Sequence, residues 1–190
     1  LIILILDQAL KIWVKTNMFL GQEHQIFDWF YIHFTENNGM AFGMEFGGDW
    51  GKLTLSLFRI VFVGFITSYL YKLVKQNADK ILITSLSLVL AGAIGNIIDG
   101  AFYGLLFNDS YHQIAKILPE SGGYAPLFFG KVVDMFYFPM FKGYLPEWFP
   151  VWGGDYVVFF RPVFNIADAA ISIGVAIMVL FQKRVMKELE

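Results

Sequence analysis

Two aspartates, Asp134 and Asp168, have the side chain and the setting for acid–base chemistry. Asp168 lies inside an apolar run long enough to cross a bilayer, and Asp134 lies in the segment that leads to that run. A carboxylate at membrane depth is costly, so it usually has a partner or a functional role. Two neighbouring carboxylates cannot both ionise cheaply, so they share a proton, and one can accept a proton while the other donates one. The pair therefore indicates acid–base chemistry on a molecule that lies in lipid.

The composition is typical of an integral membrane protein. Hydrophobic residues make up 57% of the 190 residues, charged residues make up 16%, and the mean hydropathy is +0.57. A net charge of -2 gives no basic surface for nucleic acid, so no such partner is expected. The absence of cysteine excludes disulfides and thiolate chemistry, and His24, His33 and His112 lack the spacing of metal ligands. We therefore expect no metal and no cofactor.

Four apolar segments are predicted to be transmembrane helices, because about 20 apolar residues cross the hydrocarbon core of a bilayer. Their approximate ranges are 1–18, 53–74, 81–98 and 163–181. The chain begins at Leu1, without Met and already in an apolar run, so we expect residues to be missing before it. Asp7, Lys11 and the lack of a small-residue cleavage site favour a retained helix over a removable signal.

The distribution of charge predicts the orientation of these helices. The turn between the second and third helices and the C-terminal end are basic, whereas residues 20–51 contain no Lys or Arg. Positive residues favour the cytoplasmic side, so both chain ends are expected inside and segments 19–52 and 100–162 outside. The outer segments are expected to hold short β-strands, near 27–34 and at 156–160, and amphipathic aromatic elements at the membrane interface. Residues 1–190 are predicted to form a single α-helical membrane domain.

Polar residues recur at helical spacing in three of the predicted helices. They are Asp7 and Lys11 in the first, Gly92, Asn96 and Asp99 in the third, and Asn165, Asp168 and Ser172 in the fourth. Each set shares one helical face and is expected to point into the bundle. At 1.5 Å per residue, Asp168 is expected roughly 8 Å inside the outer end of its helix. Asp99 closes the third helix at the same end, so the carboxylates can meet near the outer interface.

Some of these residues also have a purely structural explanation. Asp7 and Lys11 are spaced to form a structural ion pair. Arg59, in the second helix, is better explained as a partner for an acidic group than as a catalyst. Asn96 and Asp99 could equally tie helices together through hydrogen bonds. The structural explanation fits Asp168 least well, because a second Asp is expected close by.

Five motifs follow one another along the chain. They are Asp7-Gln8-Ala9-Leu10-Lys11, Asn37-Asn38-Gly39-Met40-Ala41-Phe42, Gly92-Ala93-Ile94-Gly95-Asn96-Ile97-Ile98-Asp99, Val132-Val133-Asp134 and Phe164-Asn165-Ile166-Ala167-Asp168. In these motifs the chain resembles the lipoprotein signal peptidases, or type II signal peptidases, of bacterial inner membranes. Each motif alone is weak, but together they cover almost the whole chain in the family's order.

The resemblance implies an aspartic endopeptidase that cleaves a diacylglyceryl-modified prolipoprotein just before its lipidated cysteine, with Asp134 and Asp168 as the catalytic pair. It implies a multi-pass protein, expected to be monomeric, in contact with membrane lipid in the bacterial inner membrane, with its active site at the outer, periplasmic face. Asp7, Lys11 and Arg59 are expected to have structural roles. The residues expected to bind substrate or support the pair are Asn37, Gly39, Asn96, Asp99, Asn165 and Arg161.

The chain departs from the family pattern in three places. Met40 stands where the family usually has Ala, and Gly100 stands where it usually has Arg after the third-helix Asp. Arg161 or Lys131 could supply the missing positive charge. The stretches 102–130 and 139–160 are longer than the family leads us to expect, and an enlarged outer lid is one hypothesis for them.

Two other classes of function remain open from the residues. A small proton- or ion-coupled carrier also uses intramembrane Asp, Asn and Lys, but it predicts polar stripes that reach both membrane faces. A non-catalytic assembly or binding subunit predicts that loss of Asp134 is tolerated. Peptide cleavage without ion flux in reconstituted vesicles would favour the protease.

Overall fold

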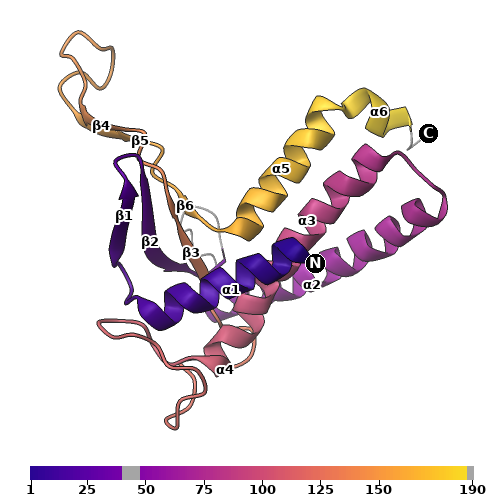
Figure 1. The fold of residues 1–190 in the computed structure, drawn as a ribbon, viewed down its shortest axis with the longest axis horizontal. Coiled ribbons are helices and arrows are strands. Elements are labelled where there is room, and N and C mark those ends of the chain that lie inside the picture. Colours follow the sequence, from indigo (N-terminus) through magenta and orange to yellow (C-terminus); the bar gives the residue numbers. More distant parts are fainter. Residues whose placement is uncertain (40–47, 188–190) are drawn as a thin grey trace.

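The computed structural model describes residues 1–39 and 48–187. Within these ranges, four long helices pack together, and a small β-sheet lies at one end of them (Figure 1). Helix α3 contacts each of the other three and so forms the centre of the bundle. The four helices are α1 (Ile2–Asn17), α2 (Gly48–Lys75), α3 (Lys80–Ile98) and α5 (Ile166–Leu180). A π-helical turn, η2 (Asp99–Tyr103), and the short α4 (Gly104–Leu106) continue α3, and α6 (Gln182–Lys187) follows α5.

Each predicted helical segment contains a helix, but two of the predicted starts are wrong. Helix α2 begins at Gly48 rather than near residue 53, and α5 begins at Ile166 rather than near residue 163. Asn165 follows the preceding strand and caps α5, because its side chain and that of Asp168 each accept a hydrogen bond from the other's backbone N–H. Asn165 therefore precedes the helix instead of sharing a helical face with Asp168. Asp168 lies in the first helical turn, nearer the helix end than the predicted depth.

Glycine lets α3 and α5 approach closely. A Cβ atom at Gly92 would lie 2.2 Å from the carbonyl oxygen of Ala167, and one at Gly174 would lie 2.6 Å from that of Ser85. No side chain fits at such separations, so these two glycines bring the backbones together as small residues do in membrane helix pairs. The close contact fixes the first turn of α5, which carries Asp168, against α3, which carries Asn96.

Two helical stretches in the described ranges are long and apolar enough to cross a membrane. They are Trp50–Lys75, with a mean hydropathy of 1.8, and Lys80–Leu106, with a mean hydropathy of 2.2. Helix α5 is also apolar but shorter. Large apolar side chains of α2, such as Phe58, Val61 and Phe65, remain exposed outside the bundle. An apolar face of this kind suits contact with lipid.

The sheet places Asp134 beside the helices. Its antiparallel strand order is β1–β2–β3–β6, with β1 (Glu23–Phe27), β2 (Phe30–Asn37), β3 (Val132–Tyr137) and β6 (Val163–Phe164). The strand expected near 27–34 is thus a hairpin that turns at residues 28–29. Asp134 lies in β3, opposite Thr35 of β2, and β6 leads directly into Asn165 and α5. A second hairpin pairs β4 (Phe141–Tyr144) with β5 (Tyr156–Phe159), which confirms the short strand predicted there.

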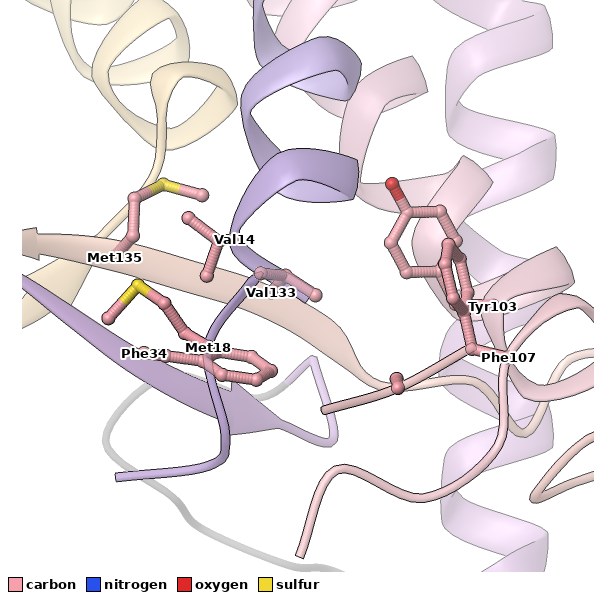
Figure 2. Close-up of a cluster of buried hydrophobic side chains, with 8 residues drawn as sticks. Val14, Met18, Phe34, Tyr103, Phe107, Val133 and Met135 are labelled. Carbon is pink, nitrogen blue, oxygen red and sulfur yellow. The ribbon is translucent and has the colours of Figure 1, made fainter. Parts of the chain in front are cut away.

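A buried apolar cluster holds the sheet against the helices (Figure 2). It joins the end of α1, strands β2 and β3, and the segment that follows α3. Its members are Val14, Met18, Phe34, Tyr103, Phe107, Ala115, Val133 and Met135, none more than 3% exposed. Val133 and Met135 flank Asp134 on β3, and the strand's alternation turns them into this cluster. Packing on both sides of Asp134 therefore fixes its position.

A buried ion pair reinforces the same junction. Lys15 of α1 pairs with Glu36 of β2, and it also donates a hydrogen bond to the Ser110 hydroxyl at 2.9 Å. The Lys15 ammonium lies 5.0 Å from the ring centre of Tyr124, where cation–π attraction adds to the pairing. These contacts tie α1, the sheet and the long loop after α4 together.

Candidate active site

Asp134 is almost fully buried and accepts hydrogen bonds from two asparagines. Asn165 Nδ2 donates to Asp134 Oδ1 at 2.7 Å, and Asn37 Nδ2 donates to Asp134 Oδ2. Asn37 is the last residue of β2, and its own Oδ1 accepts a hydrogen bond from the Gly39 backbone N–H at 2.6 Å. Two strands and the cap of α5 therefore converge on this carboxylate. Met40, Ala41 and Phe42 of the same motif lie outside the described residues.

Asp168 is half-buried and accepts hydrogen bonds from one asparagine side chain and one backbone N–H. Asn96 Nδ2 of α3 donates to Asp168 Oδ1 at 2.8 Å, and the Asn165 backbone N–H donates to Asp168 Oδ2 at 3.3 Å. Asp168 also lies in the first turn of α5, where the helix dipole favours a negative charge. These contacts fix the orientation of the Asp168 carboxylate.

Asn165 links the two carboxylates. Its amide nitrogen donates to Asp134 and, at 3.2 Å each, to Asn96 Oδ1 and the Val133 carbonyl oxygen. Its amide oxygen accepts from the Asp168 backbone N–H at 2.8 Å. One fully buried side chain thus contacts both aspartates, a bridging geometry that the predicted position of Asn165 on a helix face does not allow.

A buried charge cluster lies behind this network. Lys11 pairs with Asp7 at 3.0 Å and with Asp99 at 2.8 Å, and it donates to Asn96 Oδ1 at 2.9 Å. All three ionised side chains are 1% exposed or less. Asp99 Oδ2 accepts from the Val133 backbone N–H at 3.2 Å, and Asp7 Oδ1 accepts from the Ala167 N–H at 2.9 Å. The cluster therefore holds the backbone next to each catalytic candidate. Asp99 contacts β3 beside Asp134, and Asp7 contacts the first turn of α5 beside Asp168.

Arg59 lies at the site, whereas Arg161 does not. A small cavity beside Asn96 is lined by Arg59 of α2 and by Gly100. Gly100 stands at the position where the family usually has Arg. The Arg59 guanidinium donates to the Gly39 carbonyl oxygen and attracts the negative charge of Asp168. Gly39 has a φ of +84°, and a Cβ there would lie 2.6 Å from Arg59 Nη1, so glycine is required.

The two substitutes suggested for the missing arginine do not reach this cavity. Arg161 is exposed, and no ion pair or hydrogen bond joins it to the site within the described residues. Lys131 approaches Glu36 at 3.8 Å instead, on the far side of β3 from the carboxylate network. Arg59 is therefore the cation that stands beside Gly100.

Burial and a neighbouring charge change the proton affinity of Asp134. Burial raises the pKa of Asp134 to about 8, and the neighbouring negative charge of Asp168 adds to the increase. The charge of Lys11 and the hydrogen bonds from Asn165 and Asn37 act in the opposite direction but do not cancel it. Asp134 therefore holds a proton at neutral pH. In the described ranges, no three His, Asp or Glu side chains are grouped as a metal ion would need.

Sequence reasoning missed several residues that position the site. Gln8 donates to Asp99 Oδ1 at 2.9 Å and accepts from the Tyr103 hydroxyl at 3.2 Å, and Lys15 and Glu36 form the second buried ion pair. A signal was present for Lys15, because it follows Asp7 and Lys11 at the next i+4 position on α1. No comparable pattern marked Glu36, whose partner is distant in sequence.

Comparison with known proteins identifies the family of the chain. The model of the family described as signal peptidase (SPase) II matches residues 1–183. The chain belongs to this family of aspartic proteases. It is 53% identical over 184 residues to a lipoprotein signal peptidase of Porphyromonas gingivalis, a match that covers 96% of this chain and 80% of that one. A lipoprotein signal peptidase of Amoebophilus asiaticus is 42% identical, with 95% and 74% covered.

Two solved structures share the fold of this signal peptidase II family member. Both are described as bacterial membrane enzymes studied by the in meso method. One has a TM-score of 0.60 at 22% identity and covers 98% of this chain and 87% of its own. The other has a TM-score of 0.57 at 23% identity, with 94% and 86% covered. Together with the two long apolar helices, these two membrane-enzyme structures support a membrane location for the protein.

Proposed function

We propose that Asp134 and Asp168 form the catalytic pair of a lipoprotein signal peptidase. As a member of the signal peptidase II family, the protein removes signal peptides from prolipoproteins, and nothing in the comparisons favours an ion-coupled carrier. The observation that carries the assignment of the pair is the bridge through Asn165, which donates to the Asp134 carboxylate from its side chain and to the Asp168 carboxylate from its backbone N–H. Two adjacent aspartates that share a proton are the catalytic residues of aspartic proteases.

The surroundings assign different roles to the two aspartates. Asp168 has the helix N-terminus, the Asn96 amide and the nearby Arg59 charge, all of which stabilise a negative charge. Asp134 is more deeply buried, and its pKa is raised to about 8. We assign Asp168 as the base that accepts a proton from water and Asp134 as the acid. Asn37, Gly39, Asn96, Asp99 and Asn165 hold the pair and the peptide, while Asp7, Lys11 and Arg59 hold the charges in place.

The reaction follows from these roles. Asp168 accepts a proton from water as the water oxygen adds to the scissile carbonyl carbon, and Asp134 donates its proton to the carbonyl oxygen. As the tetrahedral intermediate collapses, Asp168 passes the proton it took from water to the amide nitrogen, so that the C–N bond breaks and a neutral amine leaves. Asp134 takes its proton back from the hydroxyl as the carbonyl group re-forms. No metal or cofactor takes part in these steps. We propose that the scissile bond precedes a diacylglyceryl-modified cysteine, whose lipid chains stay in the membrane.

The direct test uses purified protein and a lipidated precursor. We expect the protein in nanodiscs to cut a diacylglyceryl-modified prolipoprotein just before the modified cysteine, as read by mass spectrometry of both products. A precursor with Ser in place of that Cys is the control and should not be cut. Cleavage elsewhere, or equal cleavage of both precursors, would contradict the proposed specificity.

The rate of precursor cleavage should fall at alkaline pH. Because the pKa of Asp134 is raised to about 8, Asp134 is protonated below this pH and loses its proton as the pH rises through it. If Asp134 is the acid, kcat/KM should fall about tenfold per pH unit above roughly pH 8. The measurement is kcat/KM between pH 6 and 10, with circular dichroism at each pH to confirm that the fold persists. A rate that continues to rise at pH 10 would exclude this role.

Arg59 should affect the rate through its charge. Arg59→Gln removes the positive charge that attracts Asp168, whereas Arg59→Lys retains it. We expect kcat to fall about tenfold or more in Arg59→Gln, which corresponds to about 1.4 kcal/mol, with most of it restored in Arg59→Lys. Equal loss in both variants, with lowered thermal stability in both, would show that only the hydrogen bond to Gly39 matters.

The charge pattern and the site together suggest the topology. We propose that residues 1–190 form one domain with four membrane-spanning helices and both ends in the cytoplasm of a bacterial inner membrane. Segments 19–52 and 100–162 then lie on the periplasmic side, where the sheet and the catalytic pair meet the lipid interface. We propose that the protein acts as a monomer, because the pair is completed within one chain.

A further inference from the structure

The hairpin of residues 139–160 carries an unusual exposed surface. Its side chains are mostly aromatic or aliphatic, and its charged residues are Lys142, Glu147 and Asp155. Trp148 is 79% exposed, Val151 is 87% exposed and Tyr144 is 74% exposed. So large an apolar surface on a short hairpin is costly in water and marks a contact with another apolar phase.

The hairpin leaves the protein at the level of the active site. An aromatic row joins its base to the sheet, because Phe138 stacks on Trp29 at 6.1 Å and on Phe164 at 5.6 Å, and Phe160 contacts Phe164 at 6.2 Å. Phe164 immediately precedes Asn165, the cap of α5. The hairpin therefore starts beside the end of α5 at which Asp168 lies.

The direction of the hairpin also matters. In Figure 1, β4 and β5 extend sideways from the sheet, away from the bundle and across the course of α3 and α5 rather than along it. Because the helices cross the bilayer, an element that projects sideways from their ends runs along the bilayer surface. This direction does not fit the lid hypothesis, because the hairpin extends away from the catalytic pair.

We propose that residues 139–160 lie in the headgroup boundary of the membrane as a lateral anchor. Trp and Tyr side chains, with an apolar ring and one polar atom, settle at this depth. The exposed side chains at the tip of β1 and β2, Ile26, Phe27 and Trp29, continue the same apolar surface. The anchor rests on the membrane location of the protein and not on its peptidase activity.

The absence of cysteine allows a direct measurement of depth. An environment-sensitive fluorophore is attached to V151C at the hairpin tip, to V61C on the exposed face of α2, and to S121C in the other outer segment. Each labelled protein is placed in nanodiscs of phosphatidylethanolamine and phosphatidylglycerol. Quenching of the fluorophore is then measured with nitroxides attached to lipids near the headgroups and, separately, with iodide in the aqueous phase. Precursor cleavage is recorded on each sample as an independent measurement.

We expect the V151C probe to be quenched at least about threefold more by the lipid nitroxides than the S121C probe, and to be protected from iodide as the V61C probe is. Replacing Trp148 and Trp152 with Ser in V151C should reverse both effects. Equal access of iodide to the probes on V151C and S121C would overturn the proposal. Protection from iodide without lipid quenching would also overturn it, in favour of a second copy or another protein.

Discussion

Replacing Asp134 or Asp168 with Asn is expected to lower the rate of prolipoprotein cleavage at least about a thousandfold, because each variant removes one partner of the proton transfer. Asn keeps the size of the side chain, and at position 134 its amide oxygen can still accept from Asn165. Its amide nitrogen, however, faces the Asn37 amide that donates to Asp134 in the native chain, so we expect Asp134→Asn to lose about 1–3 kcal/mol of stability and to keep its fold. Single-turnover cleavage of a lipidated precursor measures the loss of rate.

An aspartate outside the site supplies the control for this prediction. Asp28 lies in the exposed turn between β1 and β2, where its carboxylate accepts from Gln25 at 3.0 Å. Asp28→Asn should keep the rate within about twofold, as expected for a surface substitution. Normal processing by Asp134→Asn would favour the reading of the chain as a binding subunit and would remove the catalytic pair.

The second large effect is expected on stability. Lys11→Met leaves Asp7 and Asp99 buried without their cation, and breaking a buried ion pair in this way costs about 3–5 kcal/mol. The cluster also holds the backbone of Val133 and Ala167, so activity should fall with the fold. The measurement is the thermal unfolding midpoint in detergent, together with the yield of folded protein.

Two further variants separate the loss of charge balance from the loss of a side chain. Lys72→Met, at an exposed position near the end of α2, should change the unfolding free energy by less than about 0.5 kcal/mol. Neutralising Asp7 and Asp99 with Asn in the Lys11→Met background should restore part of the stability, because the uncompensated charges are removed. Equal stability of Lys11→Met and the native chain would show that the cluster contributes little.

The sequence predicted the helices and the chemistry better than it predicted the sheet. Long apolar runs and helical spacing identify α1, α2, α3 and α5, and the position of Asp7 four residues before Lys11 identifies their ion pair. Strand β3, which carries Asp134, was not predicted. Its position depends on pairing with β2, almost a hundred residues earlier in the chain, and no local pattern encodes such a partner.

The helical position predicted for Asn165 is wrong. Asn165 was placed on a helical face because the apolar run continues through Val163 and Phe164, yet these residues pair with β3 and the helix begins only after its cap. The Asn-x-x-Asp spacing was a usable signal for this cap. The sequence predicts an acidic partner for Arg59, but nothing in it shows that the middle of α2 lies beside Gly39 and Gly100.

The central claim is that the two carboxylates share one proton, which Asp134 holds at neutral pH. Infrared difference spectroscopy of the protein in nanodiscs measures this directly, by the carbonyl stretch of a protonated carboxyl group. The account predicts that this band is present at pH 7 in the native chain, is missing in Asp134→Asn, and disappears as the pH rises through about 8. A native spectrum at pH 7 that Asp134→Asn leaves unchanged would contradict the account.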